Sequence, residues 1–122
     1  MSSIWILVGA VSGFIIVVLG AFGAHGLRDI LTSNQTIDIY NKAVLYQMFH
    51  SIAILIVGLL EINLGKTFNL TGILFTSGIL IFSGSLYLLA ITNMKWLGAI
   101  TPIGGLCFLA GWVILFLHTI NA

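Results

Sequence analysis

Residues 40–60 read YNKAVLYQMFHSIAILIVGLL, an apolar run broken at its centre by the polar group YQMFHS at 46–51. A helix rises about 1.5 Å per residue, so His50 lies roughly 15 Å beyond Tyr40, near the middle of a ~30 Å hydrocarbon core. Because a polar group that faces lipid without a partner costs on the order of several kcal/mol, this side of the helix must face protein or water. The inward face of the predicted helix carries Ala43, Gln47, His50, Ile54, Gly58 and Glu61.

The composition of the whole chain is that of an integral membrane protein. Of its 122 residues, 60% are hydrophobic and 6% are charged, with a mean hydropathy of +1.21, whereas soluble domains carry about 25% charged residues. The apolar runs predict an all-α, up-and-down four-helix bundle in a single membrane domain, residues 1–122. The predicted spans are residues 4–25, 38–60, 70–91 and 96–117. Pro102 removes one backbone hydrogen bond, so we expect the fourth helix to be kinked near Gly98.

Small residues recur on several of the predicted helices, and such residues let the backbones of neighbouring membrane helices approach closely. The residues that we predict to serve this packing are Gly9, Gly13, Gly20, Ala24, Gly84, Gly104 and Gly111. They provide more close-contact surface than four short helices need among themselves. The excess favours self-association, or incorporation into a larger membrane complex.

The few basic residues predict how the chain is oriented in the membrane. Arg28, Lys42 and Lys95 belong to the side of the first and third loops, whereas Lys66 stands alone on the other side. Because cytoplasmic loops carry an excess of Lys and Arg, we predict that loops one and three are cytoplasmic and that both termini lie outside. Four scattered basic residues form no patch for phosphates, so nucleic acid is not expected as a partner.

The residue types that catalysis or metal binding needs are few and far apart. The acidic residues lie at helix ends, where Glu61 is expected to be a solvated charge, and Cys107 is expected to be a packing residue. The three histidines lie at depths that differ by roughly 15 Å steps, too far apart to share one iron within a chain. Ligation of a haem by His50 from two copies of the protein is an alternative that the spacing allows. We otherwise expect no enzyme, no metal and no cofactor, with Trp5 and Trp96 as interfacial anchors.

Four motifs together resemble a known family. They are Gly20-Ala21-Phe22-Gly23-Ala24-His25-Gly26-Leu27, Tyr46-Gln47 followed by His50-Ser51, Phe82-Ser83-Gly84-Ser85-Leu86-Tyr87, and Thr101-Pro102 followed by Gly105. In combination they are similar to the domain of unknown function 423, a family of small bacterial inner-membrane proteins with relatives in mitochondria. The resemblance covers essentially the whole chain. It implies a four-helix membrane protein in the cell membrane and supplies no catalytic residues.

Two hypotheses about function follow, and a third is disfavoured. The first is a non-enzymatic bundle, surrounded by membrane lipids, that self-associates or serves as an accessory subunit of a membrane complex. The second is a pocket for a lipophilic ligand, a quinone or a lipid, around His50, lined also by Tyr46, Gln47 and His25, with Arg28 as a candidate for a lipid phosphate. A channel or carrier needs a continuous polar path, and the apolar second half of the 40–60 run does not offer one.

Overall fold

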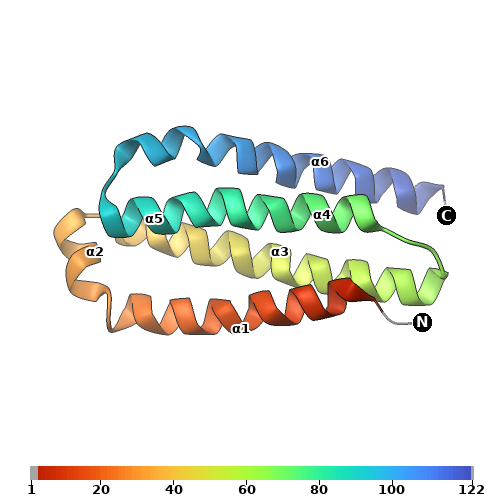
Figure 1. Ribbon diagram of the computed structural model, residues 1–122, viewed down its shortest axis with the longest axis horizontal. Helices are drawn as coiled ribbons and strands as arrows, with labels where there is room; N and C mark the ends of the chain where they lie inside the picture. Colours follow the sequence, from red (N-terminus) through yellow and green to blue (C-terminus); the bar gives the residue numbers. More distant parts are fainter. Residues whose placement is uncertain (1–2, 122) are drawn as a thin grey trace.

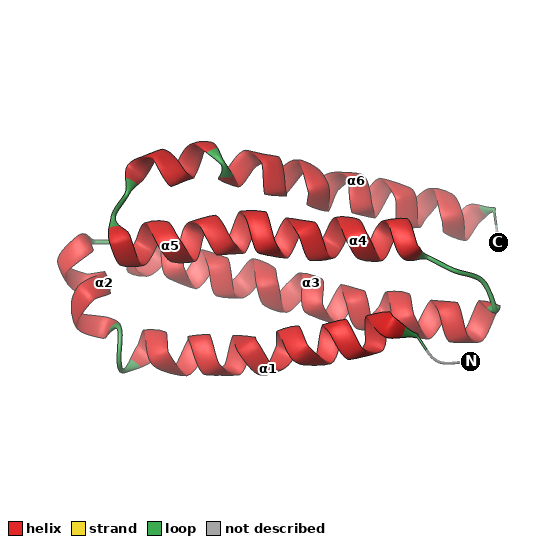
Figure 2. Ribbon diagram, viewed as in Figure 1, coloured by secondary structure: helices red, strands yellow, loops and turns green. Residues whose placement is uncertain are grey.

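The computed structural model describes residues 3–121, which form helices joined by short loops (Figure 2). The helices are α1 (Ile4–Ala24), α2 (Arg28–Asn34), α3 (Ile37–Leu64), α4 (Asn69–Gly78), the π-helix η1 (Ile79–Ser83), α5 (Gly84–Thr92), the 3₁₀ helix η2 (Lys95–Ala99) and α6 (Thr101–Ile120). Four stretches are long and apolar enough to span a membrane: α1, α3, the continuous run from α4 to α5, and the run from η2 to α6. The all-α, four-span fold predicted from the sequence is confirmed.

The spans run up and down, so both termini lie at the same end of the bundle (Figure 1). The α4–η1–α5 span and α3 form a central pair, α1 packs on α3, and α6 packs on α4 and η1. In Figure 1, α1 and α6 lie on opposite sides of this pair. The main core lies between the central helices, where Ile54, Val57, Phe68 and Phe75 are fully buried. The helices α1 and α6 are therefore the outer helices of the bundle. A cleft lies beside each of them.

The inward face predicted for α3 is confirmed. All six residues of the stripe from Ala43 to Glu61 are buried. Tyr46 lies beside this stripe and stays 39% exposed. The helical period alone therefore identified which side of α3 meets protein.

Loop one, between the first two spans, contains a short helix, α2. It ends at Gln35, whose left-handed backbone (φ 58°) stops the helix. Directly beside this stop, Asn34 Nδ2 and Thr36 Oγ1 donate to the main-chain oxygen of Ala90, at 3.1 and 2.7 Å. These bonds satisfy carbonyl groups at the end of α5, which have no partners within their own helix. Loop one is thus hydrogen-bonded to the C-terminal end of the third span.

Two expectations about the opposite end of the bundle are wrong. Glu61 is buried, not solvated: its carboxylate accepts hydrogen bonds from Ser3 Oγ and from the backbone N–H of Phe68, both at 2.6 Å. Trp5 is also buried in the protein, where Nε1 donates to Asn69 Oδ1 at 3.2 Å. The reason is that the loop after α3 folds back over the helix end, a contact that sequence spacing does not reveal.

The predicted packing glycines divide into two groups. Gly9, Gly104 and Gly111 are in close contact: a Cβ atom at Gly104 would lie 2.7 Å from Cα of Phe82, and one at Gly9 would lie 2.7 Å from the side chain of Leu55. For the other four positions, a role in packing against another copy or another protein stays a prediction. Gly13, Gly20 and Gly84 have no atom within 4 Å of such a Cβ, and Ala24 is exposed. They lie on helix faces that no other helix within residues 3–121 contacts closely.

The third and fourth spans each depart from a regular α-helix. Five residues of the third span form the π-helix η1, a feature that occurs frequently at functional sites. Its last residue, Ser83, is buried and donates from Oγ to the main-chain oxygen of Ala43 at 2.8 Å, which joins η1 to α3. The fourth span is divided at Ile100 rather than bent near Gly98, because Pro102 occupies the first turn of α6, where a missing N–H is tolerated.

Candidate functional site: two lateral clefts

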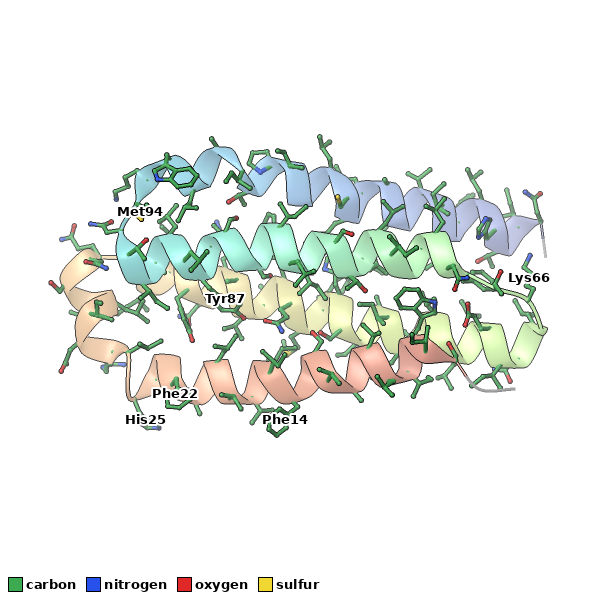
Figure 3. All side chains as sticks on the ribbon, viewed as in Figure 1. Phe14, Phe22, His25, Lys66, Tyr87 and Met94 are labelled. Atoms are coloured by element: carbon green, nitrogen blue, oxygen red, sulfur yellow. The ribbon has the colours of Figure 1, made fainter. Side chains whose placement is uncertain are left out.

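The residues predicted to line one pocket lie in three different places. His50 and Tyr46 border a cleft beside α6, whereas Gln47 borders a cleft beside α1. His25 and Arg28 are exposed at the junction of α1 and α2. Figure 3 shows His25 at the outer edge of the bundle, pointing away from it. The single pocket around His50 is therefore replaced by two clefts on opposite sides of the central helices, and neither includes His25 or Arg28.

The first of these, which we call the aromatic cleft, has a volume of about 580 Å³ and lies between α3, η1 and α6. Six aromatic rings line it: Tyr46, Phe49, His50, Phe82, Phe108 and Trp112. The rings of His50 and Phe108 stack, with centroids 3.5 Å apart and planes 10° apart, and the centroids of Tyr46 and Phe82 are 4.6 Å apart. The wall of this cleft is thus made of ring faces and edges held in fixed orientations.

His50 joins α3 to α6 through one ring nitrogen and bonds back to its own helix through the other. The indole N–H of Trp112 donates to Nε2 at 3.1 Å, and Nδ1 lies 2.9 Å from the main-chain oxygen of Tyr46. Because indole nitrogen only donates and a carbonyl only accepts, Nε2 is unprotonated and Nδ1 carries the proton. The ring is therefore neutral, and both nitrogens are engaged within the protein.

Tyr46 brings a free polar group to the same cleft. Among the described residues 3–121, its hydroxyl group makes no hydrogen bond, although its main-chain oxygen binds His50. The side chain is 39% exposed and its ring lies against Phe82. The phenol can therefore donate to a molecule that enters the cleft.

The second hollow, which we call the α1 cleft, has a volume of about 410 Å³. Its walls come from α1 on one side and from α4, η1 and α5 on the other, and they include Leu7, Val11, Ile15, Leu80, Gly84 and Tyr87. Figure 3 places Tyr87 on α5. Its hydroxyl donates to Gln47 Oε1 at 2.6 Å, and Gln47 Nε2 donates to Ser12 Oγ at 3.2 Å. Ser12 Oγ in turn lies 2.6 Å from Ser51 Oγ. This polar network forms the floor of an otherwise apolar cleft.

Several of these residues were not singled out in the sequence. Trp112 and Phe108 are four residues apart on α6, a spacing that puts them on one face, but many aromatic pairs in membrane helices share it. Ser12 looks like an ordinary residue of an apolar helix, and Tyr87 stands out only as the last residue of a family motif, until the fold brings both to Gln47. The π-helix η1 carries Phe82 and borders both clefts. It is a sign of a functional site that does not depend on the clefts themselves.

Geometry and composition together define the class: an all-helical membrane protein with four spanning segments, whose central pair is flanked by two lateral clefts. The sequence profile of the family described as "Protein of unknown function (DUF423)" matches residues 19–105, from the end of α1 to the first turns of α6. The chain belongs to this family, as its motifs indicated.

Curated relatives match over nearly the full length. A UPF0382 membrane protein of Staphylococcus epidermidis is 45% identical over 118 residues, which cover 97% of this chain and 96% of the relative. A UPF0382 membrane protein of Staphylococcus haemolyticus is 45% identical over 116 residues, covering 95% and 94%. One of Staphylococcus saprophyticus is 41% identical over 116 residues, covering 95% and 96%. No solved structure matches the chain.

Proposed function

We propose that the protein is a non-enzymatic membrane bundle whose aromatic cleft binds a lipophilic molecule with a flat ring, such as a quinone. The observation that carries the proposal is the wall of six aromatic rings around about 580 Å³. One of these rings is the phenol of Tyr46, whose hydroxyl group is free to bond to a ligand. Ligand sites are mostly apolar and aromatic, with a few polar groups that orient the ligand. This cleft has that composition.

Different residues of the aromatic cleft would make different contacts with the ligand. The ring of the ligand packs against Phe82 and Phe108, and a carbonyl oxygen accepts the hydroxyl proton of Tyr46. His50 does not bond to the ligand, because both of its nitrogens are engaged. Its contribution is to hold Trp112 and to present a rigid ring face.

A substitution at Gly105 tests the proposal. Gly105 lines the cleft, and the nearest side-chain atom to a Cβ there is 3.8 Å away on Phe82, an ordinary contact. Gly105→Leu therefore fills the cleft without displacing the backbone. We expect it to weaken binding of a short-chain ubiquinone by at least about tenfold, and Tyr46→Phe to weaken it about three- to tenfold, as one lost hydrogen bond would.

Binding is measured by native mass spectrometry of the protein in lipid nanodiscs. Gly84→Leu is the matched control, because Gly84 is an equally unhindered glycine that lines the other cleft. Retention of the quinone by the control and its loss in Gly105→Leu support the proposal. Equal retention by all variants, or no retention by the wild type, refutes it.

A second candidate function is self-association, alone or within a larger membrane complex. The observation that favours it is on α1, where Gly13 and Gly20 face open space two turns apart and the helix is mostly exposed. Small residues at this spacing let a second helix approach closely. The double variant Gly13→Leu, Gly20→Leu removes that close approach.

Oligomeric state in nanodiscs distinguishes the outcomes. We expect the wild type to be an oligomer and the double variant to be a monomer with unchanged helix content. A monomeric wild type, or a variant that assembles as the wild type does, contradicts this second function.

We also propose that the protein lies in the cell membrane with loops one and three in the cytoplasm. The support is the distribution of Arg28, Lys42 and Lys95 against Lys66. A C-terminal reporter that is active on one face only is expected to report the outside. A cytoplasmic signal overturns this orientation.

A further inference from the structure

We infer that the α1 cleft is a second binding site, and that its ligand is a lipophilic alcohol or phenol whose hydroxyl group donates a hydrogen bond to the cleft floor. This site is separate from the aromatic cleft and does not depend on the function proposed for it. The inference rests on the direction of the hydrogen bonds between Tyr87, Gln47, Ser12 and Ser51.

Two main-chain oxygens, those of Gln47 and Ser12, fix the direction of these hydrogen bonds, because a carbonyl oxygen can only accept. Ser51 Oγ lies 2.6 Å from the main-chain oxygen of Gln47, so the single hydroxyl proton of Ser51 is used there. Ser12 Oγ, 2.6 Å from Ser51 Oγ, must then be the donor in that pair. Each serine proton therefore points into the protein.

The side-chain amide of Gln47 can have only one orientation. It lies 3.3 Å from the main-chain oxygen of Ser12, which requires a donor, so Nε2 faces Ser12. Oε1 is then left on the other side, where Tyr87 donates its hydroxyl proton at 2.6 Å. The opposite orientation would place two acceptors against each other at Ser12. The proton of Tyr87 is thereby used as well.

The floor of the cleft consequently offers only lone pairs. The hydroxyl protons of Ser12, Ser51 and Tyr87, and the amide protons of Gln47, are all used within the network, while the oxygens of Tyr87, Gln47 and Ser12 retain acceptor capacity. Thr76 also lines the cleft, and its Oγ1 atom makes no hydrogen bond among the described residues, but this atom is buried and is not part of the accessible cleft surface. A carbonyl or an ether finds no donor on this floor, whereas a hydroxyl group does find an acceptor.

The depth of the polar floor in the membrane further limits which molecules can bind in the α1 cleft. Ser12 is eight residues into α1, roughly 12 Å along a helix that crosses a ~30 Å core, so the polar floor lies near the middle of the membrane. The headgroup of a phospholipid remains at the surface and cannot reach this level. The ligand is therefore a molecule dissolved within the bilayer that carries its hydroxyl group on an apolar skeleton.

A competition between two probes tests the inference directly. Farnesol and farnesyl methyl ether share one isoprenoid skeleton, and only the alcohol can donate. Both are added in equal amounts to the protein in lipid nanodiscs, and native mass spectrometry resolves the two adducts by mass. We expect the alcohol adduct to exceed the ether adduct about three- to tenfold, the range that one hydrogen bond in a membrane provides.

A blocking variant locates the site. Gly84 lines the α1 cleft and a Cβ atom there meets nothing within 4 Å, so Gly84→Leu fills the cleft and is expected to abolish the alcohol adduct. Gly20→Leu, an equally unhindered substitution outside both clefts, and Gly105→Leu, which fills the aromatic cleft, are expected to bind farnesol as the wild type does. Equal adducts of alcohol and ether, an undiminished adduct in Gly84→Leu, or no adduct in the wild type would each overturn the inference.

Discussion

The substitution Gly104→Ala, compared with Gly84→Ala, measures how tightly α6 is packed on the third span. Both residues are glycines within membrane helices, and the sequence assigned both of them to helix packing. In the structure, a Cβ at Gly104 would lie 2.7 Å from Cα of Phe82, whereas a Cβ at Gly84 would meet nothing within 4 Å. The two substitutions add the same methyl group to opposite environments.

The expected difference in stability follows from these distances. Replacing Gly with Ala in a helix raises stability by about 1 kcal/mol, and this gain is common to both variants. At Gly104 the new methyl group lies about 0.7 Å inside the 3.4 Å at which ordinary contacts begin, measured to Cα of Phe82, and it is closer still to the backbone nitrogen of Phe82. Backbone atoms cannot rotate away, so α6 has to shift as a whole. Overpacking of this kind costs about 1–3 kcal/mol, which is the predicted difference between the two variants.

The assay is reversible unfolding in mixed micelles, followed by far-ultraviolet circular dichroism. We expect Gly84→Ala to be as stable as the wild type or more stable, and Gly104→Ala to be less stable than Gly84→Ala by about 1–3 kcal/mol. Because the shared helix-propensity gain cancels in this comparison, the result reports packing alone. Equal stability of the two variants would refute the close approach of α6 to η1.

Three further substitutions test individual hydrogen bonds by the same assay. Glu61→Ala leaves the buried N–H of Phe68 and the half-buried hydroxyl of Ser3 without an acceptor, and it is expected to lower the free energy of unfolding by about 2–4 kcal/mol. Asp38→Ala, at an exposed helix start, is expected to cost at most about 0.5 kcal/mol; similar values for both would contradict the burial of Glu61. Trp112→Phe keeps a ring but removes the donor to His50, with an expected loss of about 0.6–1.7 kcal/mol; an unchanged stability would show that this bond is not formed. Thr36→Val removes a 2.7 Å bond to a carbonyl group at the end of α5, and the expected loss is about 1 kcal/mol; a stabilised variant would contradict the capping role of loop one.

Sequence periodicity predicted the helices and the buried side of α3, because a membrane helix must satisfy its backbone internally and turn its polar side chains toward protein. The same logic failed at the helix ends. Glu61 was expected in water because a carboxylate at a helix end ordinarily is. Its hydrogen bonds come instead from Ser3, which is 58 residues away in the sequence, and from the backbone of Phe68, which the loop after α3 brings back over the helix end. The π-helix η1 likewise has no unambiguous local signature, whereas the interruption of the fourth span was signalled by Pro102, although its position at Ile100 was not.

The candidate site was only partly predictable for a related reason. Tyr46, Gln47 and His50 stand out as polar residues in an apolar run. Gln47 and His50 share the buried side of α3, but positions three apart on a helix still differ by about 60° in direction, which is enough for each to meet a different helix. Gln47 meets Ser12 of α1 and His50 meets Trp112 of α6. Which helix covers which face is a property of the packed bundle.

Composition and hydrophobic period by themselves determined that this chain is a four-span helical membrane protein with polar groups sheltered at mid-depth, since the bilayer imposes those features on any such sequence. Tertiary structure alone decided that the polar groups separate into two clefts, and that Gly104 is packed while Gly84 is open. The physical reason is that small residues permit close approach between helices without choosing the partner. That choice depends on how all the side chains of the bundle fit together at once.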